Sequence, residues 1–329
     1  MKKITIIGTG AWGAGLGTIL SKNGHKVVFW GIDEQEINDI NNGYNKKYFG
    51  DIFFNNPQNV SATNNLELAL ENSDIMLLAV PSLAISSVLN QVKTILKDKK
   101  INVINVAKGF DRDSKKIFST VISDILGNNL NNIASLIGPS FAIEVFKNNL
   151  TIINAVGKNT EFLNELVQLF NNETFQLVPN NDDSGLQVYA ALKNVLAIGI
   201  GLASTLYEAK NLAPAMISIG LKEIKKIAKV LYPDSLDNSG YELAAIGDIV
   251  LTCLNTTSRN FSFGIEVANN GIKNALAANS KTVEGYNAAI ILDEIITQHK
   301  INDVVLLQSI VDVCLARKNE KNLLDFFVI

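Results

Sequence analysis

The sequence predicts an α/β protein in which an N-terminal domain built on a parallel sheet is followed by an all-α C-terminal domain. In the first half of the chain, short apolar runs alternate with helical patterns, which is typical of a parallel sheet covered by helices. Beyond about residue 185, apolar residues recur at helical spacing with almost no strand pattern. The 329 residues, 47% of them hydrophobic, suffice for two such cores.

The expected strands are short and mostly apolar. They are residues 4–7, 27–30, 75–80, 103–106 and 134–137, followed by 151–156 and 175–178 on either side of a helix at 161–170. The polar segment from Pro179 to Ser184 marks the expected boundary between the two domains. We therefore expect one domain over residues 1–181 and a second over residues 182–329.

The second domain is expected to consist of helices at 185–206, 213–231, 246–254 and 261–269 and of further helices after Glu284. The most apolar stretch, 190–206, contains Lys193 and Asn194, so a buried helix is expected rather than a membrane span. The N-terminal apolar run is too short for a signal peptide, which makes a cytoplasmic protein the expectation. The formal net charge of −3 gives nucleic acid no electrostatic attraction.

The first expected strand runs directly into a glycine-rich turn, G-x-G-x-x-G. Its glycines are Gly8, Gly10 and Gly13, with Ala11 and Trp12 between the last two. Between a strand and a helix this motif holds the pyrophosphate of a dinucleotide, because the glycines permit a tight turn, close backbone approach and close helix packing. The amides of the helix N-terminus then face the phosphates. Glycines also end strands for steric reasons, so the motifs in the rest of the chain have to show whether this turn binds a dinucleotide.

The end of the second expected strand, Trp30-Gly-Ile-Asp33, bears on the choice of cofactor. An acidic side chain there favours the free 2′-hydroxyl of NAD, whereas an arginine favours the 2′-phosphate of NADP. No arginine lies nearby, and Asp33 is the acidic candidate. NAD is therefore slightly favoured over NADP.

Polar residues at the carboxyl ends of the other strands are candidates for ligand contacts, because ligands of open α/β sheets bind there. Pro81 can pack along a cofactor, and Lys108 stands at the mouth of the expected crevice. The segment from Gly138 to Ala142, with Ser140 inside it, has exposed amides that can contact the nicotinamide. By itself, Lys108 is typical of a solvated lysine at a strand end.

The helical half offers a possible proton donor. Lys193 lies in a run that otherwise favours burial, and burial lowers a lysine pKa and suits it to proton transfer near neutrality. Asp248 and Thr252 are four residues apart, so they share one helix face, and the carboxylate can hold Lys193. Taken separately, Lys193 is typical of a lysine that snorkels to solvent, and Asp248 of a helix start.

Ser258, Arg259 and Asn260 precede another helical run. Ser258 can cap that helix, while Arg259 and the amides around Asn260 suit a phosphate. An ordinary cap beside a solvated arginine is the commoner meaning of this string alone. Two cysteines and two histidines give little material for a metal site or a histidine-based triad, so no metal is expected.

Taken in order along the chain, these motifs resemble the NAD(P)-dependent glycerol-3-phosphate dehydrogenases of bacterial type. The resemblance extends from Gly8 to about Gly285 and is specific as an ordered set. Its blocks are Gly8-Thr-Gly-Ala-Trp-Gly13, Ala79-Val-Pro-Ser82, Ala107-Lys-Gly109, Gly138-Pro-Ser-Phe-Ala142, Leu192-Lys-Asn194, Gly247-Asp-Ile-Val-Leu-Thr-Cys253, Ser258-Arg-Asn260 and Val283-Glu-Gly285. It implies a Rossmann-type domain followed by a helical substrate-binding and catalytic domain.

The resemblance implies reversible hydride transfer between NAD(P)H and dihydroxyacetone phosphate, giving sn-glycerol 3-phosphate for phospholipid synthesis. A small phosphorylated substrate and a homodimer belong to the same implication. Lys193 is then the general acid that protonates the carbonyl oxygen, with Asp248 orienting it. Lys108 and Thr252 are implied as further catalytic residues that contact the substrate or the developing oxyanion. The implied substrate contacts are Lys108, Gly138, Ser140, Lys193, Asp248, Ser258, Arg259 and Asn260. The implied cofactor contacts outside the glycine turn are Asp33, Pro81, Ala142, Arg259 and Glu284.

The chain departs from the family pattern at four positions. Ile32 replaces a basic residue near the end of the second strand, which weakens any inference of NADP use. Gln187 stands for a glutamate, Ala245 for a glycine and Phe261 for a basic residue. These three concern fine tuning rather than the class of reaction.

Two alternatives stay open. One is another two-domain NAD(P)-dependent dehydrogenase of the 2-hydroxy or 3-hydroxy acid type, such as a hydroxyacyl-CoA, ketopantoate or 6-phosphogluconate enzyme. Arg259 at a helix start favours a compact phosphorylated substrate, and the hydroxyacyl type needs a histidine that this chain lacks near Lys193. The other is a non-catalytic dinucleotide sensor, against which the joint presence of Lys193, Asp248 and Arg259 argues.

Overall fold

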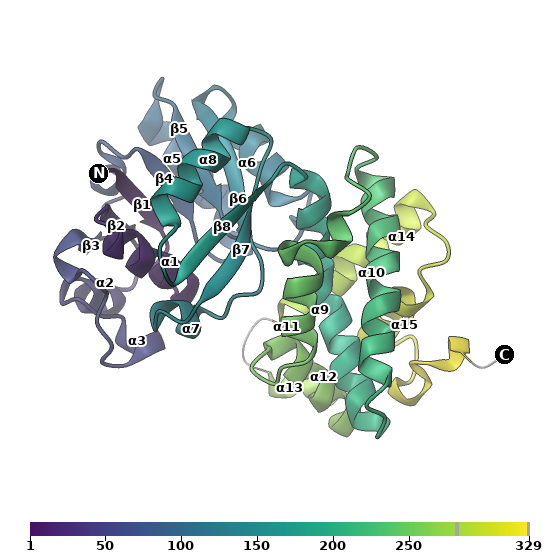
Figure 1. The fold of residues 1–329 in the computed structure, drawn as a ribbon. Helices are drawn as coiled ribbons and strands as arrows, with labels where there is room; N and C mark the ends of the chain where they lie inside the picture. The colour runs from purple at the N-terminus through teal and green to yellow at the C-terminus, as the bar shows by residue number, and fades with distance from the viewer. Residues whose placement is uncertain (280–282, 328–329) are drawn as a thin grey trace. The chain divides into compact units, whose positions relative to one another are not determined.

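The computed structural model describes residues 1–279 and 283–327 of the chain, which divides into two compact units (Figure 1). The first unit comprises Met1–Asp111 and Phe118–Asp183, and the second comprises Arg112–Ile117 and Ser184–Ile329. The first is built on a sheet and the second on helices. The predicted fold class is confirmed.

The first unit contains an eight-stranded sheet in the order β3-β2-β1-β4-β5-β6-β7-β8. All seven predicted strands are present, and one strand was missed. The bounds are β1 Lys3–Ile7, β2 Lys26–Trp30, β3 Val60–Thr63, β4 Ile75–Leu78, β5 Ile101–Asn105, β6 Leu130–Ile137, β7 Thr151–Val156 and β8 Phe175–Asn180. The missed strand, β3, is short and lies at the edge of the sheet, with Val60 as its one buried residue, so it lacks an apolar pattern.

Helices cover both faces of this sheet. Side chains of β1 and β4 alternate between two apolar cores, with Ile6 and Leu77 in one and Ile7 and Leu78 in the other. Helices α1 and α8 contribute to the first core, and α5 and α6 to the second. The helices of this unit are α1 Ala11–Lys22, α2 Glu34–Asn41, α3 Lys46–Phe49, α4 Leu66–Leu70, α5 Ile85–Leu96, α6 Phe118–Leu126, α7 Ala142–Phe146 and α8 Thr160–Phe170.

The last two strands, β7 and β8, run opposite to the other six. The alternation of the first five predicted strands with helices indicates a parallel sheet, whereas β7 pairs antiparallel with β6, with Ile137 opposite Asn154, and β8 pairs parallel with β7. The connection between β6 and β7 contains only the five-residue helix α7, which packs against α1. A parallel pair needs a full crossover, usually with a helix that covers the sheet, and this connection does not supply one.

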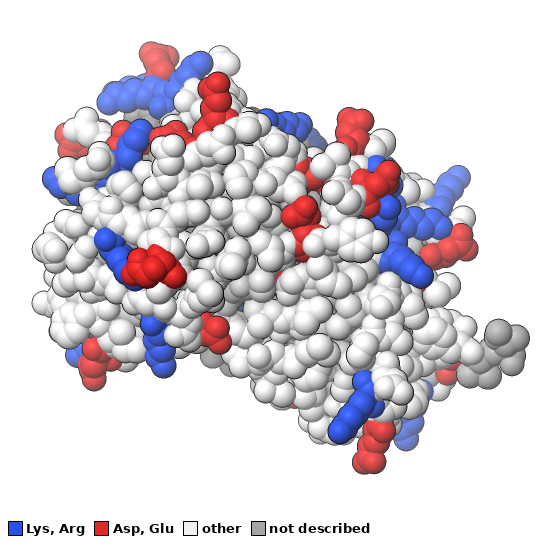
Figure 2. Space-filling view, in the orientation of Figure 1, with Lys and Arg blue, Asp and Glu red and all other residues white. Residues whose placement is uncertain are grey.

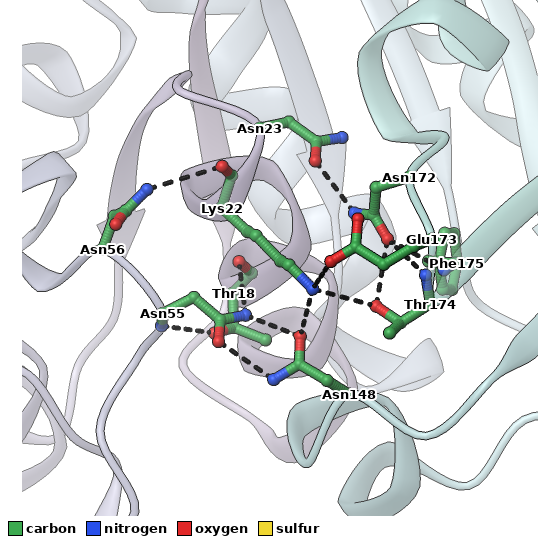
Figure 3. A network of polar contacts seen from close by, with 10 residues as sticks. All are labelled: Thr18, Lys22, Asn23, Asn55, Asn56, Asn148, Asn172, Glu173, Thr174 and Phe175. Atoms are coloured by element: carbon green, nitrogen blue, oxygen red, sulfur yellow. Dashed lines mark hydrogen bonds and ion pairs between the residues drawn. The ribbon is translucent and has the colours of Figure 1, made fainter.

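A network of polar side chains holds the C-terminal end of α1 (Figure 3). The Lys22 ammonium lies 2.7 Å from the Glu173 carboxylate and donates to the Asn148 side-chain oxygen at 3.2 Å. The side chains of Asn55 and Asn148 donate to each other at 3.0 and 2.9 Å. Because Asn55, Asn148 and Glu173 come from three separate loops, the network anchors the helix that begins at the glycine-rich turn.

The second unit is helical around one long apolar helix, α9, Asp183–Leu206. The other helices are α10 Leu212–Leu231, α11 Asp248–Cys253, α12 Arg259–Asn270, α13 Ile272–Ala278, α14 Glu284–His299 and α15 Val305–Cys314, with a π-helical turn at Leu243–Gly247. Two glycines allow α12 and α14 to approach α9 closely. A Cβ at Gly264 would lie 2.1 Å from the Ile198 carbonyl oxygen, and one at Gly285 2.5 Å from the Asn194 carbonyl oxygen.

A short segment from the middle of the first unit's sequence belongs to the second unit. Lys115, within Arg112–Ile117, places its ammonium 2.8 Å from the Glu294 carboxylate of α14. The backbone N–H of Ile117 donates to the Tyr232 hydroxyl at 3.4 Å, and the Ile117 side chain is fully buried. The second unit is therefore assembled from two separate stretches of sequence.

Helix α9 is, among the described residues, the one helix long and apolar enough to cross a membrane by length and composition. Its most apolar window has a mean hydropathy of 1.5 and is entirely buried inside the structure. Burial by the surrounding helices accounts for this hydropathy. On the face shown in Figure 2, basic and acidic side chains are interspersed among wide uncharged areas.

Candidate functional site

The glycine-rich turn has the geometry that its sequence predicts. Gly8 has φ +116°, and a Cβ there would lie 2.6 Å from the Ala79 carbonyl oxygen. A Cβ at Gly13 would lie 3.1 Å from both the Ile6 and the Ala79 side chains. Gly8 thus permits the turn, and Gly13 permits α1 to lie close to the sheet.

The start of α1 suits a pyrophosphate. Gly10 is the N-cap residue and offers no side-chain cap, so the first-turn amides of Ala11, Trp12 and Gly13 receive no side-chain acceptor from it. A Cβ placed on Gly10 would meet no atom within 4 Å, so space is open beside the backbone there. A helix of twelve residues with an uncapped N-terminus beside open space is suited to phosphate groups. The residues present therefore fit a dinucleotide.

The side chains of Glu36 and Asn45, which the sequence did not point to, hold the glycine-rich turn through Thr9. The Thr9 carbonyl oxygen accepts a hydrogen bond from the Asn45 side-chain amide at 2.8 Å, and the Thr9 hydroxyl donates to the buried Glu36 carboxylate. The Thr9 side chain lies against Gly31, where a Cβ would come within 2.5 Å of it. Thr9 lies inside the quoted motif, but no spacing rule connects it to Glu36 or Asn45.

Asp33 follows β2 and caps α2. Its Oδ1 accepts hydrogen bonds from the backbone N–H groups of Gln35 and Glu36, and its Oδ2 lies 3.7 Å from the Lys47 ammonium. The preceding residue, Ile32, is 85% exposed. The end of β2 thus presents a carboxylate and an apolar side chain, with a lysine from α3 close by.

Three predicted site residues come together after β5 and β6. The Lys108 ammonium donates to the Gly138 carbonyl oxygen at 3.4 Å, and the Ser140 hydroxyl donates to the same oxygen at 3.1 Å. Asn105, fully buried at the end of β5, accepts a hydrogen bond from the backbone N–H of Ala107 at 3.1 Å. Asn105 therefore shapes the turn before Lys108. In the sequence, an asparagine at the end of an apolar strand was the available sign of this role.

The other two predicted residues of the first unit lie at element ends. Pro81 follows β4 and is the N-cap residue of a short 3₁₀ helix at Ser82–Ala84. Ala142 is the first residue of α7. Both therefore follow strands, where ligands of such sheets bind.

In the second unit, Lys193, Asp248 and Thr252 form one buried cluster. The Lys193 ammonium donates to Asp248 Oδ1 at 2.9 Å and to Thr252 Oγ1 at 2.7 Å. The Thr252 hydroxyl in turn donates to the Asp248 backbone oxygen at 2.6 Å. The exposed fractions of the Lys193 and Asp248 side chains are 8% and 3%, so water screens this charge pair poorly.

The local fold explains how this cluster forms. Asp248 is the first residue of α11 and follows the π-helical turn Leu243–Gly247, in which Ala245 is fully buried. Such turns occur frequently at functional sites. Cys253, the next residue after Thr252, has its pKa raised to about 12 by burial, so its thiol stays neutral near pH 7.

Arg259 and Asn260 stand in the first turn of α12. Ser258 is the N-cap residue, and its side chain accepts a hydrogen bond from the Phe261 backbone N–H at 3.3 Å. The Arg259 guanidinium lies 3.7 Å from the Glu284 carboxylate, with exposed fractions of 66% and 52%. The Asn260 side-chain oxygen accepts a hydrogen bond from the Gly285 backbone N–H at 2.9 Å, which ties the start of α12 to the start of α14.

Asn194 is a further residue that the candidate set omitted. Its side-chain amide lies 3.4 Å from the Glu284 carboxylate as a hydrogen-bond donor, so Glu284 lies between Asn194 and Arg259. Asn194 follows Lys193 directly and is buried, and its position beside a candidate site residue was the available signal. Within residues 1–279 and 283–327, no three histidine, cysteine, aspartate or glutamate residues gather as metal ligands would.

Comparison with known families gives matches over both halves of the chain. Residues 3–163 match the N-terminal domain of NAD-dependent glycerol-3-phosphate dehydrogenase, and residues 182–325 match the C-terminal domain of the same family.

Individual relatives agree with this family match. The chain is 43% identical over 314 residues to a glycerol-3-phosphate dehydrogenase [NAD(P)+] of Malacoplasma penetrans, covering 94% of this chain and 91% of the relative. It is 35% identical to the protein of the same name from Mesoplasma florum, covering 92% and 90%.

Among solved structures, glycerol-3-phosphate dehydrogenase from Coxiella burnetii superposes with a TM-score of 0.89 at 26% identity, covering 99% of this chain and 98% of that one. A 2-dehydropantoate 2-reductase from Bacillus subtilis superposes with a TM-score of 0.59 at 16% identity, a similarity of fold alone.

Proposed function

Because the chain belongs to the NAD-dependent glycerol-3-phosphate dehydrogenase family, we propose that it interconverts dihydroxyacetone phosphate and sn-glycerol 3-phosphate with NAD(H) or NADP(H). The observation that carries the proposal is the buried cluster of Lys193, Asp248 and Thr252. A dinucleotide sensor has no use for a buried ammonium held at 2.9 Å by a carboxylate. The product serves phospholipid synthesis, which places the enzyme in lipid metabolism.

Lys193 acts as the general acid of the reduction. A nicotinamide cofactor, when bound, would supply the hydride for C2 of the substrate, and the carbonyl oxygen would then take up negative charge. Lys193 donates a proton to that oxygen, while Asp248 keeps the ammonium oriented. Thr252 accepts a hydrogen bond from Lys193 and thereby limits the directions in which the ammonium can point. In the reverse reaction, the neutral amine of Lys193 takes the hydroxyl proton.

Arg259 and Asn260 hold the phosphate of the substrate. The guanidinium offers a fork of donors, and the first turn of α12 adds the partial positive charge of a helix N-terminus. Glu284 is a weak, exposed partner of Arg259, so an incoming phosphate can replace it at little cost. Binding energy from the phosphate then positions C2 for hydride transfer.

The first unit supplies the cofactor contacts and a second set of substrate contacts. Gly8, Gly10 and the uncapped start of α1 hold the pyrophosphate, and Asp33 accepts from the adenosine ribose. Lys108 and Ser140, which share the Gly138 carbonyl oxygen, are donors to substrate oxygens.

The test is the oxidation of reduced cofactor in the presence of dihydroxyacetone phosphate, followed by absorbance with NADH and NADPH in parallel. We expect turnover with dihydroxyacetone phosphate and far slower turnover with dihydroxyacetone, which lacks the phosphate. Binding of both cofactors without turnover would favour the sensor. Turnover only with a 2-hydroxy or 3-hydroxy acid would favour the other dehydrogenase types.

We further propose that the enzyme is a cytoplasmic homodimer. This rests on the resemblance to the bacterial family. Sedimentation equilibrium at micromolar concentration tests the dimer, and fractionation of cells into membrane and cytosol tests the location. A mass equal to one chain, or recovery with the membranes, would contradict it.

A further inference from the structure

A triad of charged residues stands where the second strand ends. Lys47 of α3 contacts the Glu36 carboxylate through its ammonium, which also lies 3.7 Å from Asp33 Oδ2. The three residues come from three places: the loop after β2, the first turn of α2, and α3. Their formal charges sum to one negative charge.

The two carboxylates differ in burial, and this difference determines which of them binds Lys47 more tightly. The Glu36 side chain is 8% exposed, while that of Asp33 is 45% exposed. A buried carboxylate is costly without a cation, so Glu36 is the stronger partner. The hydrogen bond to Glu36 is the first cause that raises the pKa of Lys47, which keeps the ammonium charged.

The location gives the triad a functional meaning. In Rossmann-type domains, an acidic residue about 20 residues beyond the glycine fingerprint accepts from the adenosine ribose, and a cation nearby accommodates a 2′-phosphate. Asp33 stands at that distance from Gly13 and at the end of β2. Ile32 provides no cation, so Lys47 is the cation beside Asp33.

We propose that Glu36 and Lys47 together determine the choice between NAD(H) and NADP(H), with Glu36 holding the Lys47 ammonium away from the cofactor. In the native chain, a 2′-phosphate meets two carboxylates and a lysine already engaged by one of them, so NADH binds more tightly than NADPH. Without the charge of Glu36, the same ammonium is available to the 2′-phosphate. The inference rests on the proposed dinucleotide binding and specifies how one part of that site selects its ligand.

The experiment is equilibrium titration of the purified, full-length protein with NADH and with NADPH, without substrate, followed by cofactor fluorescence. The quantity compared is the ratio of the dissociation constant for NADPH to that for NADH. Glu36→Gln keeps an acceptor for the Thr9 hydroxyl but removes the charge that holds Lys47. We expect the ratio to fall about tenfold, since one charge-assisted hydrogen bond corresponds to a change of that size.

Two further variants make the result specific. Lys47→Met leaves Asp33 and Glu36 without their cation, so the ratio should rise rather than fall. Glu34→Gln removes one charge from an exposed side chain in the same turn of α2 and serves as the matched control, with an expected change of less than about twofold.

The outcomes separate this inference from the proposed function. If the native protein binds neither cofactor, dinucleotide binding itself is wrong. If it binds them and the ratio stays constant in both Glu36→Gln and Lys47→Met, the selection mechanism is wrong. An equal fall in Glu34→Gln would show a general effect of charge and would also overturn it. Should Glu36→Gln fail to fold, the rise expected for Lys47→Met tests the inference by itself.

Discussion

Two ion pairs of the helical unit, Lys193–Asp248 and Arg259–Glu284, are built in opposite ways. The first joins nearly buried side chains at 2.9 Å, and the second joins largely exposed side chains at 3.7 Å. Breaking a buried pair leaves an unpaired charge at a cost of about 3–5 kcal/mol, whereas an exposed pair contributes about 0–1 kcal/mol. A group that transfers a proton needs a constant position, and a group that captures a phosphate needs a partner that it can leave. The difference in burial therefore suits Lys193 to proton transfer and Arg259 to phosphate binding.

The strongest test of the comparison removes the buried ammonium. Lys193→Met should lower kcat by about 10²–10⁴-fold, because the developing alkoxide loses its proton donor. The dissociation constant for NADH, measured by fluorescence, should stay unchanged. Lys222→Met, at an exposed position of α10, is the control. A kcat close to that of the native chain would remove Lys193 from the mechanism.

The partner of that lysine is tested through stability. Asp248→Ala leaves the Lys193 ammonium buried without its carboxylate and should lower the free energy of unfolding by about 3–5 kcal/mol. Urea unfolding of the purified protein measures it. The double variant Lys193→Met with Asp248→Ala should recover part of the loss, because it contains no unpaired buried charge. Equal stability of the single and double variants would contradict the pairing.

The exposed pair should respond differently. Arg259→Ala should raise KM for dihydroxyacetone phosphate by about ten- to a hundredfold, the range expected from one or two lost charge-assisted hydrogen bonds. The measurement compares kcat/KM for dihydroxyacetone phosphate with that for dihydroxyacetone. If both substrates lose equally, Arg259 does not bind the phosphate. Glu284→Gln should change the free energy of unfolding by less than about 1 kcal/mol.

Glu223 is a third buried ionisable residue of the helical unit, and the effect of pH on its contribution to stability extends the comparison. Glu223 of α10 is buried, and its carboxylate accepts hydrogen bonds from the backbone N–H groups of Leu306 and Leu307 at 2.9 and 2.8 Å. Burial raises its pKa above the ordinary value of 4.5, although the two amides and Lys226 oppose this. The protonated form is therefore favoured by folding, and its contribution is present below the unfolded pKa and is lost as pH rises through the folded value.

The measurement is the difference in unfolding free energy between the native chain and Glu223→Gln at a series of pH values. This difference should be most favourable to the native chain near about pH 4 and should decline toward neutrality. A difference that grows with rising pH would mean that the two amides outweigh burial.

Much of the fold could be predicted because apolar patterns define it. The runs in β1, β4 and β7 are continuous or nearly so, and the helical spacing of α9 and α10 is regular. Strand β3 escaped prediction because its one buried residue gives no period. The reversed direction of β7 and β8 could not be predicted, because direction depends on the path of the connection and leaves no pattern in the strands themselves.

In the candidate site, too, contacts within one helix could be predicted from the sequence, whereas contacts between separate elements could not. Asp248 and Thr252 could be placed together because four residues make one helical turn. That Lys193 meets them depends on how α9 packs with α11, and this becomes known only from the fold. The hydrogen bonds that join Glu36 and Asn45 to Thr9 connect residues that share no local sequence pattern, so no motif predicts these contacts.

The segment Arg112–Ile117 sets an order of events during synthesis. Its partners Tyr232 and Glu294 leave the ribosome later than the segment does. Because translation proceeds at about 5–20 residues per second, Glu294 is synthesised roughly 10–40 s after Lys115. During that interval the Ile117 side chain, fully buried in the finished protein, has no core to enter. The burial of Ile117 therefore waits until the C-terminal helices have been made, although the segments on either side of it belong to the first unit.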